Sequence, residues 1–238
     1  MKKTLLSLAC ASLLASSGAF ASDWTLTGNV GLVSDYMFRG ITQTDSDPAI
    51  QGGLDLTHVK GFFAGVWGSN VESDVTAVVN YNGANVELDA YLGWSGEIAN
   101  KTTLTVKALR YNYPGSNLAL DPDTNEYSAY LGHDFGRFSA KAGVNYSDDF
   151  YGAKEATYLD LGVSIPVGRV TVGLHYGAQD YNNDALGDDY QDYSVGVSGT
   201  AAGLNLGVTF TGTDGVATTN TTRAAYDDAV VFSVSKTF

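Results

Sequence analysis

Histidine is the side chain most often used for metal binding and for acid–base chemistry near neutral pH, and this sequence contains three: His58, His133 and His175. None has another ligand at the i, i+2 or i, i+4 spacing, so a dedicated zinc site is not expected. A hydrolase needs Ser, His and an acidic or amide partner, but no nucleophile elbow or similar motif supports one. We therefore predict no catalytic residue, no metal site and no cofactor; an outer-membrane lipase is the less favoured enzymatic alternative.

Charged and polar side chains recur at every second position of several segments. If the apolar positions between them face lipid, these side chains line the interior of a barrel. The candidate pore-lining residues are Arg39, Asp55, Glu87, Asp89, Tyr91, Lys107, Lys141, Asp160, His175 and Asp192, with the uncharged Asn29, Gln51, Tyr130, Asn145 and Gln179 beside them. Carboxylates outnumber lysines, so a water-filled interior would mildly favour cations. Alternatively, these charges pair across the interior and stiffen the wall.

Arg39 lies in the segment Phe38-Arg39-Gly40, where the chain enters its first long polar loop. One interpretation places this arginine at the constriction of a channel, in contact with solute anions or carboxylates. The other is structural: Arg39 pairs with Asp35 or Asp45 and folds the loop. We favour the structural interpretation.

Residues 1–21 have the three parts of a secretory signal peptide: two lysines, an apolar run over 5–14 and a small-x-small exit at Ala19-Phe20-Ala21. The only cysteine, Cys10, lies within this segment. Removal of Lys2 and Lys3 from the 13 basic residues leaves 11 against 26 acidic ones, a net charge near −15. Such a surface repels the phosphate backbone, so nucleic acid is not an expected partner.

Alternating apolar and polar residues predict about twelve strands, each about long enough to cross a bilayer at a tilt. In residues 85–95, for example, Val86, Leu88, Ala90, Leu92 and Trp94 oppose Glu87, Asp89, Tyr91 and Gly93. The predicted strands are 23–35, 50–58, 62–72, 85–95, 102–113, 126–135, 137–147, 156–165, 169–179, 190–200, 203–212 and 229–238. The alternation is lost over 109–113, which predicts a β-bulge there.

The connections alternate between short turns and long, acidic loops. This layout predicts an all-β fold for residues 22–238: a single transmembrane antiparallel up-and-down β-barrel with short periplasmic turns and long extracellular loops. A soluble sandwich or lipocalin-like barrel is the alternative. Twelve strands enclose more space than eight and less than sixteen, so the interior is narrow or partly blocked by a folded-in loop. We expect the loop carboxylates to form a solvated acidic surface facing lipopolysaccharide.

Aromatic residues cluster towards the two ends of the predicted strands, as in the interfacial belts of membrane barrels. Those near the short turns are Trp24, Phe62, Trp94, Phe135, Phe138 and Phe238; those near the long loops are Tyr36, Tyr111, Tyr113, Tyr127, Tyr146 and Tyr176. The segment 229–238 ends on Phe238 and carries one charge, Lys236, in its apolar register. We expect this segment to pair with residues 23–35, and Lys236 to extend to the periplasmic interface.

Several segments resemble the TorF family of outer-membrane proteins, which are assigned as porins by inference. The likeness is carried by Val33-Ser34-Asp35-Tyr36 and Phe38-Arg39-Gly40, by residues 48–56 and 62–67, by residues 87–94 and by Phe238. It implies an outer-membrane barrel without catalytic residues and without an established substrate. It also implies that Phe238 is a recognition signal for the barrel-insertion machinery.

The favoured function is a porin-like channel in the bacterial outer membrane for passive diffusion of small polar solutes or ions, not an enzyme. The alternative is a barrel with a closed interior that acts as a structural or surface protein. Outer-membrane lipids and lipopolysaccharide, the insertion machinery and small polar solutes are the expected partners.

Overall fold

The computed structural model describes residues 23–72, 81, 83–116, 122–152, 155–182, 188–216 and 223–238. The predicted signal peptide, residues 1–21, lies outside the described residues. Within the described ranges, no helix has the length and apolar character needed to cross a membrane.

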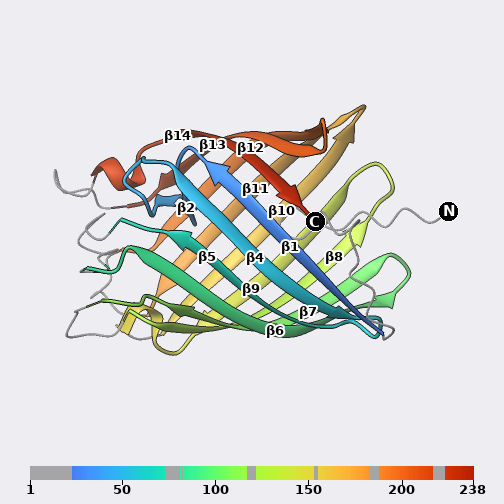
Figure 1. Cartoon of the computed structure of the whole chain (residues 1–238), viewed down its shortest axis with the longest axis horizontal. Coiled ribbons are helices and arrows are strands. Elements are labelled where there is room, and N and C mark those ends of the chain that lie inside the picture. The colour runs from blue at the N-terminus through green and yellow to red at the C-terminus, as the bar shows by residue number, and fades with distance from the viewer. Residues whose placement is uncertain are drawn as a thin grey trace.

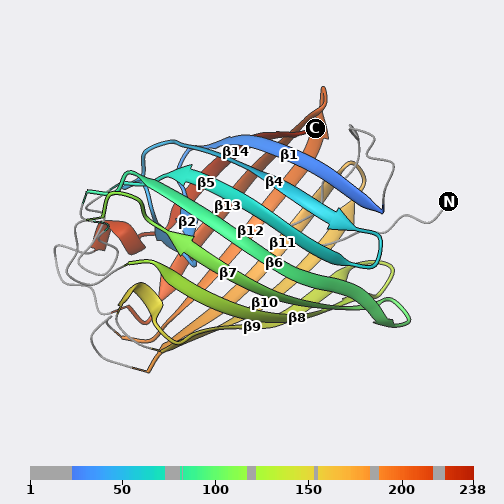
Figure 2. The same ribbon diagram turned by 60° about the horizontal axis from the view of Figure 1, so that its bottom comes forward.

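Twelve antiparallel strands form a closed barrel in which each strand pairs with its neighbours along the chain and the last pairs with the first (Figures 1 and 2). They are β1 (Trp24–Val33), β4 (Ala49–His58), β5 (Phe62–Asn70), β6 (Val86–Ala99), β7 (Thr102–Asn112), β8 (Thr124–Asp134), β9 (Ser139–Ser147), β10 (Ala156–Val167), β11 (Val170–Tyr181), β12 (Tyr190–Ala201), β13 (Leu204–Asp214) and β14 (Ala229–Thr237). The predicted fold class is confirmed.

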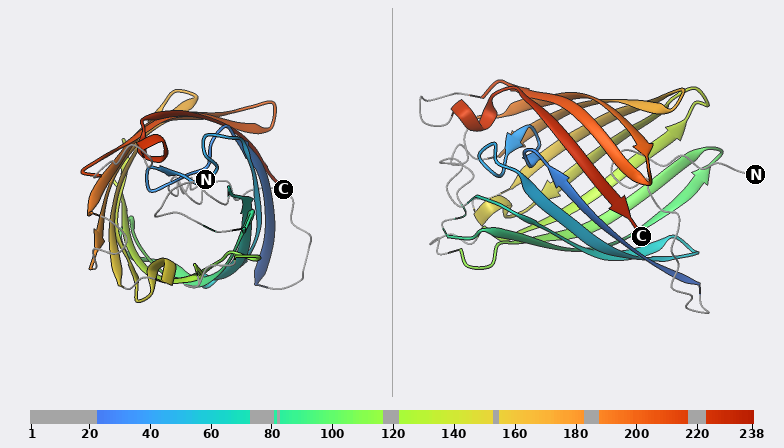
Figure 3. Two further views of the ribbon diagram at one scale, coloured as in Figure 1. Left: turned by 90° about the vertical axis from the view of Figure 1, so that its left-hand side faces the viewer. Right: turned by 45° about the horizontal axis from the view of Figure 1, so that its top comes forward.

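Four short elements lie between the barrel strands in the part of the chain that the structure describes. Strands β2 (Met37–Phe38) and β3 (Ile41–Thr42) pair with each other in a separate two-stranded sheet. Two short 3₁₀ helices, η1 (Phe150–Gly152) and η3 (Arg223–Tyr226), belong to the connections after β9 and β13. These connections lie at the same end of the barrel, and the view along its axis shows the β2–β3 segment inside the ring of strands (Figure 3).

The outer face of the barrel wall is apolar and its inner face is polar, as expected for a barrel in lipid. Along β6, Leu88 and Leu92 point outward and are 48% and 63% exposed, whereas Glu87 and Asp89 point inward and are buried. Similar outward-facing Leu and Val side chains occur on the other strands. A water-soluble sheet would bury this apolar set, so the apolar exterior is typical of a wall solvated by lipid.

The bulge predicted over 109–113 is wrong. Strand β7 pairs regularly with β6 through this region, with Tyr91 opposite Leu109 and Asp89 opposite Tyr111. The register shift between β6 and β7 lies instead at the short-turn end, between Glu97 and Ala99. The alternation of apolar and polar residues is lost here because the inside of the barrel is apolar near the long loops. The inward side chains of β7 pack there in an apolar cluster, whereas the outward Arg110 is exposed.

Only part of the predicted belt near the long loops faces outward. Tyr127, Tyr146 and Tyr176 are exposed on the outer surface, as expected for an interfacial belt. The assignment of Tyr36, Tyr111 and Tyr113 to that belt is wrong: Tyr111 and Tyr113 belong to a buried cluster inside the barrel, and Tyr36 packs against it. A tyrosine suits either surroundings because it combines an apolar ring with a polar hydroxyl.

The barrel closes where β14 meets β1. The pairing runs from Val33 opposite Ser233 to Asn29 opposite Thr237. Two further backbone hydrogen bonds extend it, from Gly28 N to the Phe238 carbonyl at 2.8 Å and from Phe238 N to the Gly28 carbonyl at 2.9 Å.

The Phe238 ring occupies the space left by the missing side chain of Gly28. A Cβ atom at residue 28 would lie 2.7 Å from Cε2 of that ring and 3.2 Å from a methyl carbon of Leu54. The ring therefore lies across the seam and contacts both β1 and the neighbourhood of β4, so it supports the joint as well as covering it.

Replacement of Phe238 by alanine should weaken the closure by about 1–2 kcal/mol, because roughly half of an aromatic side chain is buried at the seam. Folded membrane barrels migrate differently on detergent gels before and after heating. We expect Phe238→Ala to lose the folded band at a lower temperature than the native chain. Phe62→Ala, which removes an aromatic of similar exposure on β5, away from the seam, is the control; equal melting of the two variants would contradict a seam role for Phe238.

Candidate functional site: the barrel lumen

The alternation of the strands places nine of the ten candidate pore-lining residues on the inward face, and the β2–β3 connection carries the tenth, Arg39, into the interior. The strand residues are Asp55 on β4, Glu87, Asp89 and Tyr91 on β6, Lys107 on β7, Lys141 on β9, Asp160 on β10, His175 on β11 and Asp192 on β12. They come from most of the circumference. The chemistry of the interior therefore depends on which of these groups contact one another.

Four neighbouring strands carry a continuous network of charges. Lys141 Nζ lies 2.6 Å from Asp160 Oδ2, and His175 Nδ1 lies 3.4 Å from Asp160 Oδ1. His175 Nε2 is 2.9 Å from Asp192 Oδ1, and the Tyr158 hydroxyl donates to the other oxygen of Asp192 at 2.8 Å. Along this wall, the charged groups pair laterally between strands, so each carboxylate has a basic side chain beside it.

The opposite part of the wall is less well paired. Asp55 accepts a hydrogen bond from the Tyr91 hydroxyl at 2.6 Å. Glu87 Oε2 and Asp89 Oδ1 are buried and have no hydrogen-bond partner; Asp160 Oδ1 on the other side also lacks a hydrogen bond, but His175 lies 3.4 Å from it. Within the described ranges, no three His, Cys, Asp or Glu side chains come together as a metal site.

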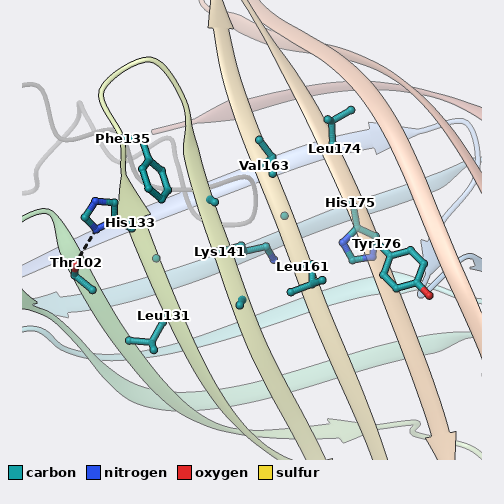
Figure 4. A pocket seen from close by; sticks show the side chains of 14 residues that line it. Thr102, Leu131, His133, Phe135, Lys141, Leu161, Val163, Leu174, His175 and Tyr176 are labelled. Atoms are coloured by element: carbon teal, nitrogen blue, oxygen red, sulfur yellow. Dashed lines mark hydrogen bonds between the residues drawn. The ribbon is translucent and has the colours of Figure 1, made fainter.

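A pocket of about 530 Å³ lies against strands β8–β11 near their short turns (Figure 4). Its lining includes Leu131, Leu161, Leu174 and Tyr176, which are exposed apolar side chains of the outer surface. His133, which accepts or donates a 2.8 Å hydrogen bond with Thr102, lies at its edge (Figure 4). This hollow is therefore an apolar depression of the lipid-facing side and not part of the lumen.

The β2–β3 hairpin enters the lumen, and its tip contacts the wall at β12 and β13. Its two-residue turn consists of Arg39 and Gly40, both with positive φ (48° and 76°), as a tight hairpin of this length requires. A Cβ at residue 40 would lie 2.6 Å from Thr213 Cγ2 and 2.8 Å from Asp192 Cβ. Glycine is needed here for its backbone conformation and for its lack of a side chain, because the tip lies directly against β12 and β13.

The side chain of Arg39 extends further around the lumen and is anchored on β8 and β11. Its guanidinium forms a buried ion pair with Glu126 on β8 and donates to Gln179 Oε1 on β11 at 2.9 Å. The guanidinium carbon also lies 4.1 Å from the centroid of the Tyr158 ring, and the Tyr190 hydroxyl donates to the Arg39 carbonyl at 3.1 Å. Burial lowers the pKa of Arg39, but the Glu126 carboxylate more than offsets this and raises it above the ordinary value.

The expected pairing of Arg39 with Asp35 or Asp45 is wrong. Asp35 instead accepts hydrogen bonds from the Thr42 hydroxyl at 2.5 Å and the Thr44 hydroxyl at 3.1 Å, which hold the base of the hairpin. Burial raises the pKa of the Asp35 carboxyl, and these two hydrogen bonds oppose the rise. The hairpin points away from its own loop, so its tip meets carboxylates that are distant in sequence.

A tyrosine-rich cluster fills the lumen around the hairpin at the long-loop end. The Tyr81 and Tyr113 rings stack with their centroids 4.3 Å apart, and the Tyr113 and Tyr151 hydroxyls are 3.2 Å apart. Tyr81 also donates to Gln43 Oε1. The buried members are Ile41, Val71, Tyr81, Ala84, Leu109, Tyr111, Tyr113, Tyr190, Ala225 and Tyr226. We call the hairpin and this cluster together the plug.

Sequence reasoning missed Glu126 and most of the plug. Two features of the sequence indicated them. Leu109, Tyr111 and Tyr113 are at alternate positions from the polar Lys107, so in a regular strand they point inward as it does. Glu126 likewise shares the parity of the inward Ser128 and Tyr130. The predicted bulge concealed the first of these signals.

Residues 17–238 match the sequence profile of a family described as "Bacterial protein of unknown function (Gcw_chp)". No curated protein matches the chain. Among solved structures, a NanC porin aligns with a TM-score of 0.54 and 10% identity over 89% of this chain and 98% of its own. A KdgM porin in complex with disordered oligogalacturonate aligns with a TM-score of 0.55 and 8% identity over 90% of this chain and 97% of its own.

At these identities, the likeness to NanC and KdgM shows the fold alone: that of small outer-membrane porins. The family match is independent of it and covers almost the whole sequence. The chain belongs to the bacterial Gcw_chp family.

Proposed function

We propose that this protein is a channel of the bacterial outer membrane through which small polar solutes or ions diffuse passively. The observation that carries the proposal is the distribution of side chains over a closed wall, with an apolar exterior and a charged interior. A barrel needs an apolar exterior to reside in lipid, and a charged interior provides a polar route across the membrane. The resemblance to the TorF family and the porin fold support the same assignment.

The same proposal assigns the orientation. Residues 1–21 direct export, and the Phe238 strand is read by the insertion machinery. The short turns then face the periplasm, and the long loops face lipopolysaccharide. No step of this function needs a cofactor, and the polar groups of the lumen act by solvation and electrostatics, without chemical conversion of the solute.

The charge of the lumen favours positively charged or neutral solutes. Its carboxylates are Asp55, Glu87, Asp89, Glu126, Asp160 and Asp192, and its permanent bases are Arg39, Lys107 and Lys141. The excess of negative charge should repel anions in a low-dielectric tube. An oligogalacturonate, as in the KdgM complex, is a polyanion and is therefore a poor candidate for this lumen.

A closed-lumen surface protein is the second candidate, and the plug is the observation that favours it. The hairpin and the tyrosine cluster occupy part of the interior at the long-loop end, and in this candidate they block solute passage unless the plug moves. The two proposals differ in whether the plug moves at equilibrium. The Arg39–Glu126 ion pair is one of the contacts that hold its tip in place, together with those to Gln179 and Tyr190.

Purified, folded protein should give discrete conductance steps in planar bilayers. In a KCl gradient, the reversal potential should have the sign of a cation preference, because the lumen is net negative. A folded sample without steps would exclude the channel and leave the closed surface barrel.

Replacement of Arg39 by alanine should increase the open fraction of the channel at least about tenfold. The change removes one partner of a buried ion pair, which costs about 3 kcal/mol, and that cost falls on the closed state because Glu126 is left unpaired beneath the hairpin. Single-channel recording measures the shift.

Arg110→Ala is the matched control for this variant. Arg110 also pairs with a carboxylate, Asp123 at 2.9 Å, but on the exposed outer side of the long-loop end. It should leave gating unchanged. Equal behaviour of the two variants would show that the Arg39 pair does not hold the plug.

A further inference from the structure

Two neighbouring carboxylates lie on the wall at the level of the plug, where Asp89 is opposite Tyr111. Glu87 and Asp89 are two residues apart on β6, so their side chains project from the same face of the strand. They are only 2% and 9% exposed, and one oxygen of each, Glu87 Oε2 and Asp89 Oδ1, has no hydrogen-bond partner. Burial of a carboxylate that lacks a charged partner costs several kcal/mol, so a positive group beside these two oxygens would stabilise the pair.

The bases of the lumen do not supply that group. Arg39 is committed to Glu126, and Lys141 to Asp160. Lys107 attracts the Asp89 carboxylate, but the negative charge of Glu126 repels it. Two adjacent carboxylates thus share the influence of one lysine, and a net negative charge is left on this part of the wall.

The surroundings of Glu87 are aromatic. The Tyr36 and Tyr113 hydroxyls interact with its carboxylate. The Tyr81 and Tyr151 rings pack against Tyr113, with ring centroids 4.3 Å and 5.9 Å from it. Tyrosine faces attract cations, and carboxylates bordered by such rings recognise ammonium groups. A divalent metal fits less well, because no third acidic or histidine ligand joins the pair among the residues that the structure describes.

We propose that Glu87, Asp89 and the surrounding tyrosines bind the ammonium group of a small organic cation. The cation supplies the missing positive partner of the two carboxylates, and the tyrosine rings contact its alkyl substituents. Since Tyr36 and Tyr81 belong to or pack against the plug, the cation reaches the pair when the plug moves. The role of this site in transport rests on the proposed channel function; the binding itself does not.

Trp67 provides an optical reporter for binding. Its ring centroid is 5.5 Å from that of Tyr36, inside the barrel. The other two tryptophans, Trp24 and Trp94, lie near the short turns, so the variant Trp24→Phe/Trp94→Phe keeps one reporter beside the site. Tetramethylammonium chloride is the probe, titrated at pH 7.5 into the detergent-solubilised barrel with sodium chloride adjusted to constant ionic strength.

We expect a saturable change in Trp67 emission that Glu87→Gln/Asp89→Asn weakens at least tenfold. These amides are nearly isosteric and remove uncompensated charge, so the folded band on detergent gels should be kept. Asp123→Asn, which removes a carboxylate on the outer side of the same end, should bind like the reporter variant. A linear emission change, or equal binding by the double amide variant, would overturn the proposal. If protons alone neutralise the two carboxylates, the emission change is linear.

Bilayer recordings with the same variants separate this inference from the channel itself. Saturable binding without conductance supports the cation site and excludes the channel. Conductance without saturable binding overturns the site and leaves the channel in place. If both are present, the permeability of tetramethylammonium relative to chloride should fall in the double amide variant but not in Asp123→Asn.

Discussion

The structure depends on one constraint: every backbone N–H and C=O group in contact with lipid needs a hydrogen-bond partner within the protein. An open sheet leaves an unpaired edge on each side, so β14 has to return to β1. The seam shows how closely this condition is met, because pairing continues beyond the last strand residue to Gly28 and Phe238. Closure also fixes the parity of all twelve strands, and that parity decides which side chains face lipid and which face the lumen.

Twelve strands enclose a wider space than their own side chains fill, and the protein fills the two halves of this space differently. Midway along the wall, inward charges pair sideways between strands, as Lys141, Asp160 and His175 do. Near the long loops, the connections fold inward and bury tyrosines around the β2–β3 hairpin. The interior is thus a polar tube at one end and a packed core at the other.

Much of this fold could be predicted from the sequence, because lipid outside and polar groups inside produce a strict alternation. The predicted strands agree with the observed ones apart from a few residues at their ends, as the extension of β6 to Ala99 shows. The alternation stops being informative where the interior of the barrel becomes apolar, which is why the pattern places Tyr111 and Tyr113 on the wrong face. The partner of Arg39 was beyond prediction, since the 87 residues that separate it from Glu126 give no sign of their proximity in space.

The hairpin also has a mechanical consequence. A tube whose wall is one strand thick resists bending of its circumference poorly and can flatten into an oval. The connection from β1 to β4 spans the tube and is fastened by Arg39 to β8 and β11, with Gly40 pressed against β12 and β13. It therefore acts as an internal strut that keeps the cross-section round, and the shape of the barrel is maintained by a loop as well as by its wall.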